Sequence, residues 1–140
     1  MTPRSPPFFD TNILLYSISR DVAEAGKRRL AIALLNGDDG ALSVQVLQEF
    51  YWQATRVTRA GRLSHDMAVA LIKRWTRFRV QEINLAILNA ALEIRVAHGF
   101  SYWDSAIIAA ARALGCQELY TEDLSHGRQV EGVLIINPFR

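Results

Sequence analysis

Phe8-Phe9-Asp10-Thr11-Asn12-Ile13-Leu14-Leu15-Tyr16 is the segment from which the architecture of this chain can be predicted. Two apolar residues after Pro6-Pro7 predict a short strand, and Asp10-Thr11-Asn12 supplies turn-forming side chains. The apolar residues that follow begin a helical turn. A strand that runs almost directly into a helix is typical of proteins in which the two kinds of element alternate.

Outward from this segment, short apolar runs do alternate with longer stretches of helical periodicity. Residues 122–132 read as a loop or a short helix. Strands are predicted at 41–44, 80–83, 118–121 and 133–136, and helices at 22–35, 45–57, 85–98 and 103–114, with another helix starting after Ser64. This order predicts an α/β fold with a central parallel sheet of about five strands, flanked by helices on both sides.

The composition is that of one globular domain. The chain has 140 residues, of which 50% are hydrophobic and 21% charged, so we expect a single domain over residues 1–140. The longest apolar stretch, 106–111, is much shorter than the roughly 20 residues that span a bilayer. The first residues also lack the apolar region of a signal peptide. We therefore expect a cytoplasmic protein that does not interact with a membrane.

The net charge of +2 gives no global attraction for nucleic acid, but the basic residues are bunched along the chain. The bunches are Arg20 with 27–29, then Arg56, Arg59 and Arg62, and then Lys73, Arg74, Arg77 and Arg79. Solvated outer faces of helices explain any one bunch. Together the bunches permit a polyanionic partner.

Four acidic residues stand where predicted strands and helices meet. Asp10 ends the first strand, and Asp123 follows the strand at 118–121. Glu49 lies in the first turns after the strand at 41–44, and Asp104 begins a helix. Ligands of parallel sheets bind at the carboxyl ends of the strands, and clustered carboxylates without basic partners are typical of divalent-cation sites. Oxygen ligands suit Mg²⁺ or Mn²⁺, which points to phosphoryl transfer or phosphodiester hydrolysis.

Each acid also has a purely structural explanation. Asp104 follows Ser101 by three positions, which is the spacing of a helix capping box. Asp10 and Asp123 could be ordinary turn formers or helix caps. Glu49 is different, because a residue inside a helix cannot cap it and its apolar neighbours make burial of a carboxylate costly. The structural explanation must account for all four acids at one end of the sheet.

The sequence lacks the motifs of several other enzyme classes. Its histidines show no H-E-x-x-H spacing, and its single cysteine cannot form a paired zinc site. Neither a G-x-S-x-G nucleophile motif nor a phosphate-binding G-x-x-x-x-G-K-[ST] loop occurs. The acidic residues therefore remain the strongest catalytic candidates.

The order of these residues resembles a known family. The matching segments are Phe9-Asp10-Thr11-Asn12, Glu49, Tyr102-Trp103-Asp104-Ser105-Ala106-Ile107-Ile108-Ala109-Ala110-Ala111, Leu119-Tyr120-Thr121-Glu122-Asp123-Leu124 and the closing Val133-Leu134-Ile135-Ile136-Asn137-Pro138-Phe139. The chain is similar to PIN-domain ribonucleases, and specifically resembles the VapC toxins of bacterial type II toxin-antitoxin pairs. The resemblance spans nearly the whole chain, and its specificity lies in the order and spacing of the segments.

The resemblance implies a PIN-like fold, homodimerisation, RNA cleavage that depends on Mg²⁺ or Mn²⁺, and inhibition by a small cognate antitoxin. The catalytic and metal-binding residues would be Asp10, Glu49, Asp104 and Asp123, with Asp10 and Asp104 closest to the metal. The residues that orient these carboxylates or touch a phosphate would be Thr11, Asn12, Ser43 and Thr121. The implied reaction is in-line attack by a metal-activated water on an RNA phosphate, leaving a 5′-phosphate and a 3′-hydroxyl.

One departure and two alternatives accompany this resemblance. Many members carry a further acid two positions after the fourth one, where this chain has Ser125, and Glu122 could compensate. A phosphatase of the haloacid-dehalogenase type would use Asp10 as nucleophile, but it needs a second Asp at the place of Asn12. A non-catalytic RNA- or protein-binding module would use the acids only as helix caps.

Overall fold

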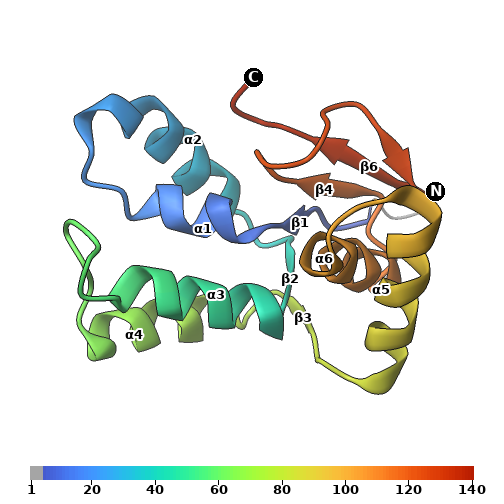
Figure 1. Cartoon of the computed structure of the whole chain (residues 1–140). Helices are drawn as coiled ribbons and strands as arrows, with labels where there is room; N and C mark the ends of the chain where they lie inside the picture. The colour runs from blue at the N-terminus through green and yellow to red at the C-terminus, as the bar shows by residue number, and fades with distance from the viewer. Residues whose placement is uncertain (1–4) are drawn as a thin grey trace.

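The computed structural model describes residues 5–140 and contains a six-stranded sheet with the strand order β3-β2-β1-β4-β6-β5 (Figure 1). The strands are β1 (Phe8–Phe9), β2 (Ala41–Ser43), β3 (Arg79–Gln81), β4 (Glu118–Tyr120), β5 (Gln129–Val130) and β6 (Val133–Ile136). All neighbours pair in parallel except β5 and β6, which are antiparallel. The predicted parallel core of the sheet is therefore confirmed, with one extra strand at its edge.

Six α-helices and one 3-10 turn surround the strands. They are α1 (Thr11–Ser17), η1 (Val22–Glu24), α2 (Ala25–Leu35), α3 (Val44–Thr55), α4 (His65–Trp75), α5 (Leu85–His98) and α6 (Tyr102–Ala113). Figure 1 shows α5 and α6 together on one side of the strands and α1 to α4 on the other. The α/β class and the two-sided covering are thus as predicted. Within residues 5–140, no helix is both long and apolar enough to cross a membrane.

The prediction of a loop or short helix at 122–132 was wrong, because this stretch contains β5. The chain reverses at Glu131-Gly132, where both residues have positive φ angles of 52° and 82°. Consecutive positive φ angles are the geometry of a two-residue hairpin turn, which pairs Val130 with Val133. Glu131 is not one of the usual residues for this turn, so the sequence carried little signal of the hairpin.

Helix α5 presents an apolar stripe to solvent. Its long apolar side chains Leu85, Leu88, Leu92 and Val96 are between 39% and 88% exposed. The side of α5 that packs inward instead carries Ala91 and Ile94, which are almost fully buried. The regular apolar spacing in this helix therefore marks an outer face rather than the core.

Gly40, just before β2, leaves room for two aromatic rings. The rings of Phe9 and Phe78 pack with their centroids 5.9 Å apart, and a Cβ atom on Gly40 would lie 2.8 Å from atoms of both. Gly40→Ala should lower the free energy of unfolding by about 1–3 kcal/mol, since overfilling a packed core costs that much. Urea denaturation measures this change.

Gly26 in the first turns of α2 is the matched control. No atom lies within 4 Å of a Cβ atom built there, so Gly26→Ala should stabilise the protein by up to about 1 kcal/mol through its better helix propensity. Equal stability of the Gly40→Ala variant and the wild type would show that the two rings can move apart at no cost.

Candidate active site

The junction between β1 and α1 buries the carboxylate of Asp10. Parallel pairing of β1 with β4 brings the end of β4 beside this residue, whose backbone N–H donates to the carbonyl of Tyr120. Asp10 Oδ1 accepts a hydrogen bond from the N–H of Thr11 (2.7 Å), and Oδ2 accepts one from Thr121 Oγ1 (2.9 Å). Asp10 is only 6% exposed. Asp10 therefore caps α1, as the structural explanation allowed, and its carboxylate is also held by Thr121, the residue directly after β4.

Glu49 lies in α3, and together with Gln45 of the same helix it links α3 to α1 and α6 at this edge of the sheet. Its Oε2 accepts a hydrogen bond from Thr11 Oγ1 at the start of α1 (2.8 Å). Its Oε1 accepts one from Gln45 Nε2 (3.1 Å), which also donates to the carbonyl of Trp103 in α6 (3.3 Å). Gln45 was not among the predicted site residues. Its position four residues before Glu49, on the same face of the helix, is the signal that could have identified it.

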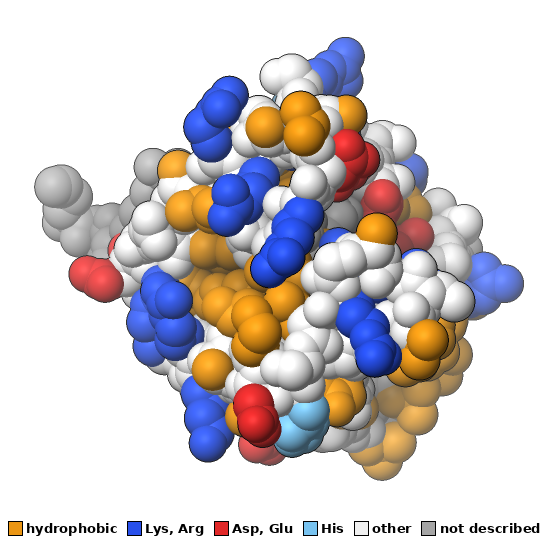
Figure 2. Space-filling model, turned by 90° about the vertical axis from the view of Figure 1, so that its left-hand side faces the viewer, with side chains coloured by type: hydrophobic (Ala, Val, Ile, Leu, Met, Phe, Trp, Pro, Cys, Tyr) orange, Lys and Arg blue, Asp and Glu red, His pale blue; other side chains and the backbone are white. Residues whose placement is uncertain are grey.

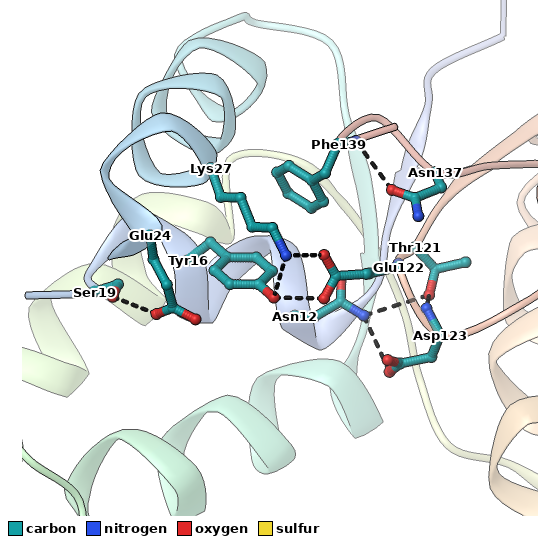
Figure 3. A network of polar contacts seen from close by, with 10 residues as sticks. All are labelled: Asn12, Tyr16, Ser19, Glu24, Lys27, Thr121, Glu122, Asp123, Asn137 and Phe139. Atoms are coloured by element: carbon teal, nitrogen blue, oxygen red, sulfur yellow. Dashed lines mark hydrogen bonds and ion pairs between the residues drawn. The ribbon is translucent and has the colours of Figure 1, made fainter. Parts of the chain in front are cut away.

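Asp123 follows β4 and pairs with Asn12, as Figure 3 shows. Asn12 Nδ2 donates to Asp123 Oδ2 (3.1 Å) and to Thr121 Oγ1 (3.4 Å). The backbone N–H of Asp123 donates to the same Thr121 hydroxyl (3.1 Å). Asp123 is exposed, so its carboxylate lies at the surface of the site while that of Asp10 lies below it.

Asp104 and Ser43 both take part in helix capping. Ser101 Oγ accepts a hydrogen bond from the N–H of Asp104 (3.1 Å), which is the predicted capping contact at the start of α6. Ser43 Oγ accepts one from the N–H of Val46 (3.2 Å) and so caps α3, the helix that carries Glu49. Among the hydrogen bonds of the described residues, none joins Ser43 to one of the four acids.

The four carboxyl groups interact through their charges. Burial raises the pKa of Asp10 to about 6, and the charges of Asp123 and Glu49 add to this, against the lowering effect of its two hydrogen bonds. Burial also raises the pKa of Asp104, and the same two charges contribute. The burial cost is thus the larger cause of both shifts. Asp123 and Glu49 each act on both of the other acids, so the four share one electrostatic environment.

Within residues 5–140, the ion pairs involve Glu122 and Glu131 and none of these four acids. The same part of the chain holds no group of three or more His, Cys, Asp or Glu side chains arranged to bind a metal ion. The acids are therefore neighbours without a cationic partner, but they do not form a ready-made cage of ligands.

A cleft of about 510 Å³ opens beside the acids. Thr11, Asn12, Glu49 and Asp123 are among its polar lining residues, and its apolar lining residues are Leu15, Trp52 and Trp103. The two tryptophan side chains are more than 60% exposed. The site thus combines carboxylates with aromatic surfaces that a flexible ligand could contact.

Glu122 does not occupy the place of the missing fifth acid. Its Oε1 accepts a hydrogen bond from the Tyr16 hydroxyl, and its Oε2 lies 2.5 Å from Lys27 Nζ. Both oxygens are therefore committed to α1 and α2 (Figure 3). Burial alone would raise the pKa of Glu122, but the hydrogen bonds from Lys27 and Tyr16 outweigh it and hold the pKa below its usual value. Ser125, the residue at that place, is exposed.

Comparison with known structures shows the same fold in toxin proteins. VapC20 from Mycobacterium tuberculosis, described as a toxin that cleaves the sarcin-ricin loop, is 26% identical, with a TM-score of 0.63 over 84% of this chain and 89% of that chain. A toxin-antitoxin complex from Klebsiella pneumoniae has a TM-score of 0.69 at 20% identity, covering 94% of this chain and 97% of that chain. At that identity the likeness shows the fold alone.

FitAcB from Neisseria gonorrhoeae gives a similar result, with a TM-score of 0.64 at 18% identity over 95% of this chain and 98% of that chain. No curated protein matches the sequence significantly. The model of the PIN domain, however, matches residues 8–129 and confirms the resemblance seen in the sequence. Several of the structural neighbours are described as VapC or VapBC proteins. With a match over most of its length, the chain belongs to the PIN domain family.

Proposed function

We propose that this protein is a metal-dependent endoribonuclease and acts as the toxin of a toxin-antitoxin pair. The observation that carries the proposal is the gathering of Asp10, Glu49, Asp104 and Asp123 in one electrostatic environment, at the carboxyl ends of parallel strands and without an ion-pair partner among residues 5–140. Such a cluster of uncompensated carboxylates is costly unless a cation binds it. The single domain expected from the sequence would carry the whole site.

The donor set fits Mg²⁺ or Mn²⁺. These cations take oxygen ligands, and Mg²⁺ usually keeps several waters and uses only one or two carboxylates with substrate phosphate oxygens. A ready-made cage is therefore not required. Asp10 and Asp104 would hold the ion, with Glu49 and Asp123 completing the negative site. When bound, the cation would lower the pKa of water and neutralise charge that develops on the scissile phosphate.

The side chains around the acids would keep them in place. The Thr121 hydroxyl holds Asp10, and the Thr11 hydroxyl holds Glu49. Asn12 orients Asp123, while Ser43 supports Glu49 less directly by starting the helix on which it lies. Substitution of residues that orient metal-binding side chains usually lowers metal affinity or activity by about 10–100-fold. We therefore assign positioning roles to Thr11, Asn12 and Thr121.

The charge distribution supports RNA as the substrate. Figure 2 shows Lys and Arg side chains around a hollow with apolar walls, on the side where α1 to α4 lie. Arg74 and Arg77 line one hollow of the molecule, and Arg20 and Arg59 line another, which also contains Asp21 and Glu24. Positive side chains of this kind attract a phosphate backbone. The description of the related VapC20 as a toxin that cleaves the sarcin-ricin loop also favours RNA.

The partners implied are an antitoxin and a second copy of the chain. Several structural neighbours are described as toxin-antitoxin or VapBC complexes, so we propose that a cognate antitoxin inhibits this protein in the cytoplasm. The exposed apolar stripe on α5, with Leu85, Leu88, Leu92 and Val96, is the surface that a homodimer would cover.

The two alternatives receive different support. In a haloacid-dehalogenase-type phosphatase the residue at position 12 would be the general acid. Asn12 donates hydrogen bonds to Asp123 and Thr121, but an amide is too weak an acid to transfer a proton. The binding module is favoured by the capping contact of the Asp10 carboxylate. At the start of α6 the cap is Ser101, to which Asp104 donates only its backbone N–H. Glu49, which caps nothing, argues against it.

Incubation of the purified protein with total RNA tests the proposed function. After removal of metals with EDTA, cleavage should be absent and should return with Mg²⁺ or Mn²⁺. Mapped products should carry 5′-phosphate and 3′-hydroxyl ends. Equal cleavage in EDTA would overturn the metal dependence, and hydrolysis of p-nitrophenyl phosphate without RNA cleavage would favour the phosphatase.

A further inference from the structure

Glu122 is held by two helices that contribute no acid to the site. Lys27 Nζ of α2 lies 2.5 Å from Glu122 Oε2, and the Tyr16 hydroxyl of α1 donates to Oε1. Lys27 also donates to the Tyr16 hydroxyl (3.2 Å), which closes a triangle of three polar side chains (Figure 3). Both carboxylate oxygens of Glu122 are thus occupied by donors.

Aromatic rings reinforce this triangle. The ring of Phe139 packs edge-on against Tyr16, with centroids 4.9 Å apart. The ammonium group of Lys27 lies 4.9 Å from the centre of the Tyr16 ring and 5.7 Å from that of Phe139, within the range of cation–π attraction. The rings therefore restrict the ammonium group to the position in which it meets Glu122.

The triangle acts on the segment that carries two site residues. Glu122 stands between Thr121 and Asp123, directly after β4. The N–H of Thr121 still donates to the carbonyl of Ile136 in β6, whereas the N–H groups of Glu122 and Asp123 donate to the side chains of Asn12 and Thr121. The side chains of its two neighbours contact the site, Thr121 through Asp10 and Asp123 through Asn12. The side chain of Glu122 is instead held by Tyr16 of α1 and Lys27 of α2, and not by one of the four acids or their partners. A segment fixed from both sides has fewer conformations available.

We propose that Lys27 and Tyr16 are positioning residues, which clamp Glu122 and thereby hold Thr121 and Asp123 in the geometry of the site. This inference deepens the proposed function and rests on it for the catalytic consequence, although the clamp itself can be measured without metal or RNA. Side chains that fix site residues from behind determine whether the reacting groups are aligned, and small displacements cost large factors in rate.

The clamp matters for local order more than for global stability. The side chains of Lys27 and Glu122 are 40% and 26% exposed. Ion pairs as open as this contribute little to the free energy of unfolding. Loss of the clamp should therefore release residues 122–125 without unfolding the protein.

Hydrogen exchange of the metal-free protein tests the clamp directly. In Lys27→Met, amides of residues 122–125 should exchange about tenfold faster than in the wild type, because the local opening becomes easier. Lys27→Arg keeps the charge and should restore most of the protection. Arg28→Met removes a neighbouring exposed charge from α2 and should leave the exchange of this segment unchanged. Wild-type exchange in Lys27→Met would overturn the proposal.

Cleavage kinetics test the consequence. Lys27→Met should lower kcat about tenfold with little change in KM, since a misplaced site residue affects the reaction more than binding. In a Glu122→Gln background the same substitution should have a much smaller effect, because the partner of Lys27 has been weakened. A change in KM alone, or an equal effect in both backgrounds, would mean that Lys27 contacts RNA directly and would refute the clamp. If the wild type cleaves no RNA, the proposed function fails while hydrogen exchange still decides on the clamp.

Discussion

Asp10→Asn should lower the rate of RNA cleavage on the order of 10³-fold, because the buried carboxylate would be one of the two groups that hold the catalytic cation. The fold should remain, since Asn is as good a helix cap as Asp and can still accept the hydrogen bond from Thr11. The measurement is the single-turnover rate on a defined RNA at saturating Mg²⁺. Asp39→Asn, in the exposed loop before β2, is the matched control and should cleave like the wild type.

The same variant should be more stable than the wild type when metal is absent. Burial holds the pKa of Asp10 near 6, so ionisation of the wild-type carboxyl at pH 7 costs free energy that Asn does not pay. A gain of about 2 kcal/mol is expected, after allowing about 1 kcal/mol for a weakened hydrogen bond to Thr121. Urea denaturation in EDTA measures it.

Loss of RNA cleavage in a variant that is at least as stable as the wild type distinguishes a functional carboxylate from a structural one. If Asp10 served only as a cap of α1, the Asn variant would cap equally well and the rate of RNA cleavage would stay at its wild-type value. The gain in stability follows from burial of the carboxyl and is expected in either case. A variant that cleaves RNA as fast as the wild type would therefore refute a catalytic role for Asp10, whatever its stability.

The parts of the fold that were predictable from the sequence depend on local signals. Strand β1 runs into α1 within a few residues, and Asp10 supplies the turn between them. The bounds of α5 also follow from its ends, since Asn84 caps it and Gly99 ends it with a φ angle of 77°. Such contacts lie within a few residues of each other, so the sequence contains all the information they need.

Other parts depend on contacts between distant segments. Lys27 and Glu122 are 95 positions apart, and nothing near either residue indicates its partner. The inward face of α5 is likewise set by its packing on α6, which favours the small Ala91 over the larger leucines. Propensity and periodicity describe one element at a time, so they could not indicate which of two apolar faces would be buried.

The candidate site contains features that were predictable from the sequence and features that depend on contacts between distant segments. The placement of the acids at one edge of the sheet followed from the alternation of strands and helices, because this predicts a parallel sheet and the carboxyl ends of parallel strands meet at one edge. Their individual partners did not: the bond from Thr11 to Glu49 and that from Asn12 to Asp123 required the helices to be in place. The sequence indicated that the four acids would lie at one edge of the sheet, but it did not indicate their partners or Gln45, and their catalytic role stays a prediction.

The metal-free protein should lose stability as the pH rises. The carboxyl of Asp10 has a pKa of about 6 in the folded protein and 3.8 when unperturbed, so the folded state holds this proton more tightly. Its contribution to the free energy of unfolding is fully present below about pH 4 and disappears as the pH passes 6. A shift of about two units corresponds to about 3 kcal/mol. Asp104, whose pKa is also raised, contributes in the same direction.

Comparison with Asp10→Asn isolates this contribution from other titrating groups, including Glu122, whose lowered pKa acts in the opposite direction. Urea denaturation of both proteins in EDTA between pH 4.5 and 7.5 should give curves that diverge, with the wild type losing more stability toward neutral pH. Mg²⁺ should reverse the loss in the wild type, because a cation stabilises the ionised form of the carboxyl. A difference between the two proteins that is independent of pH would mean that the Asp10 carboxyl ionises at no cost, and the physical reason for a cation at this site would then be lost.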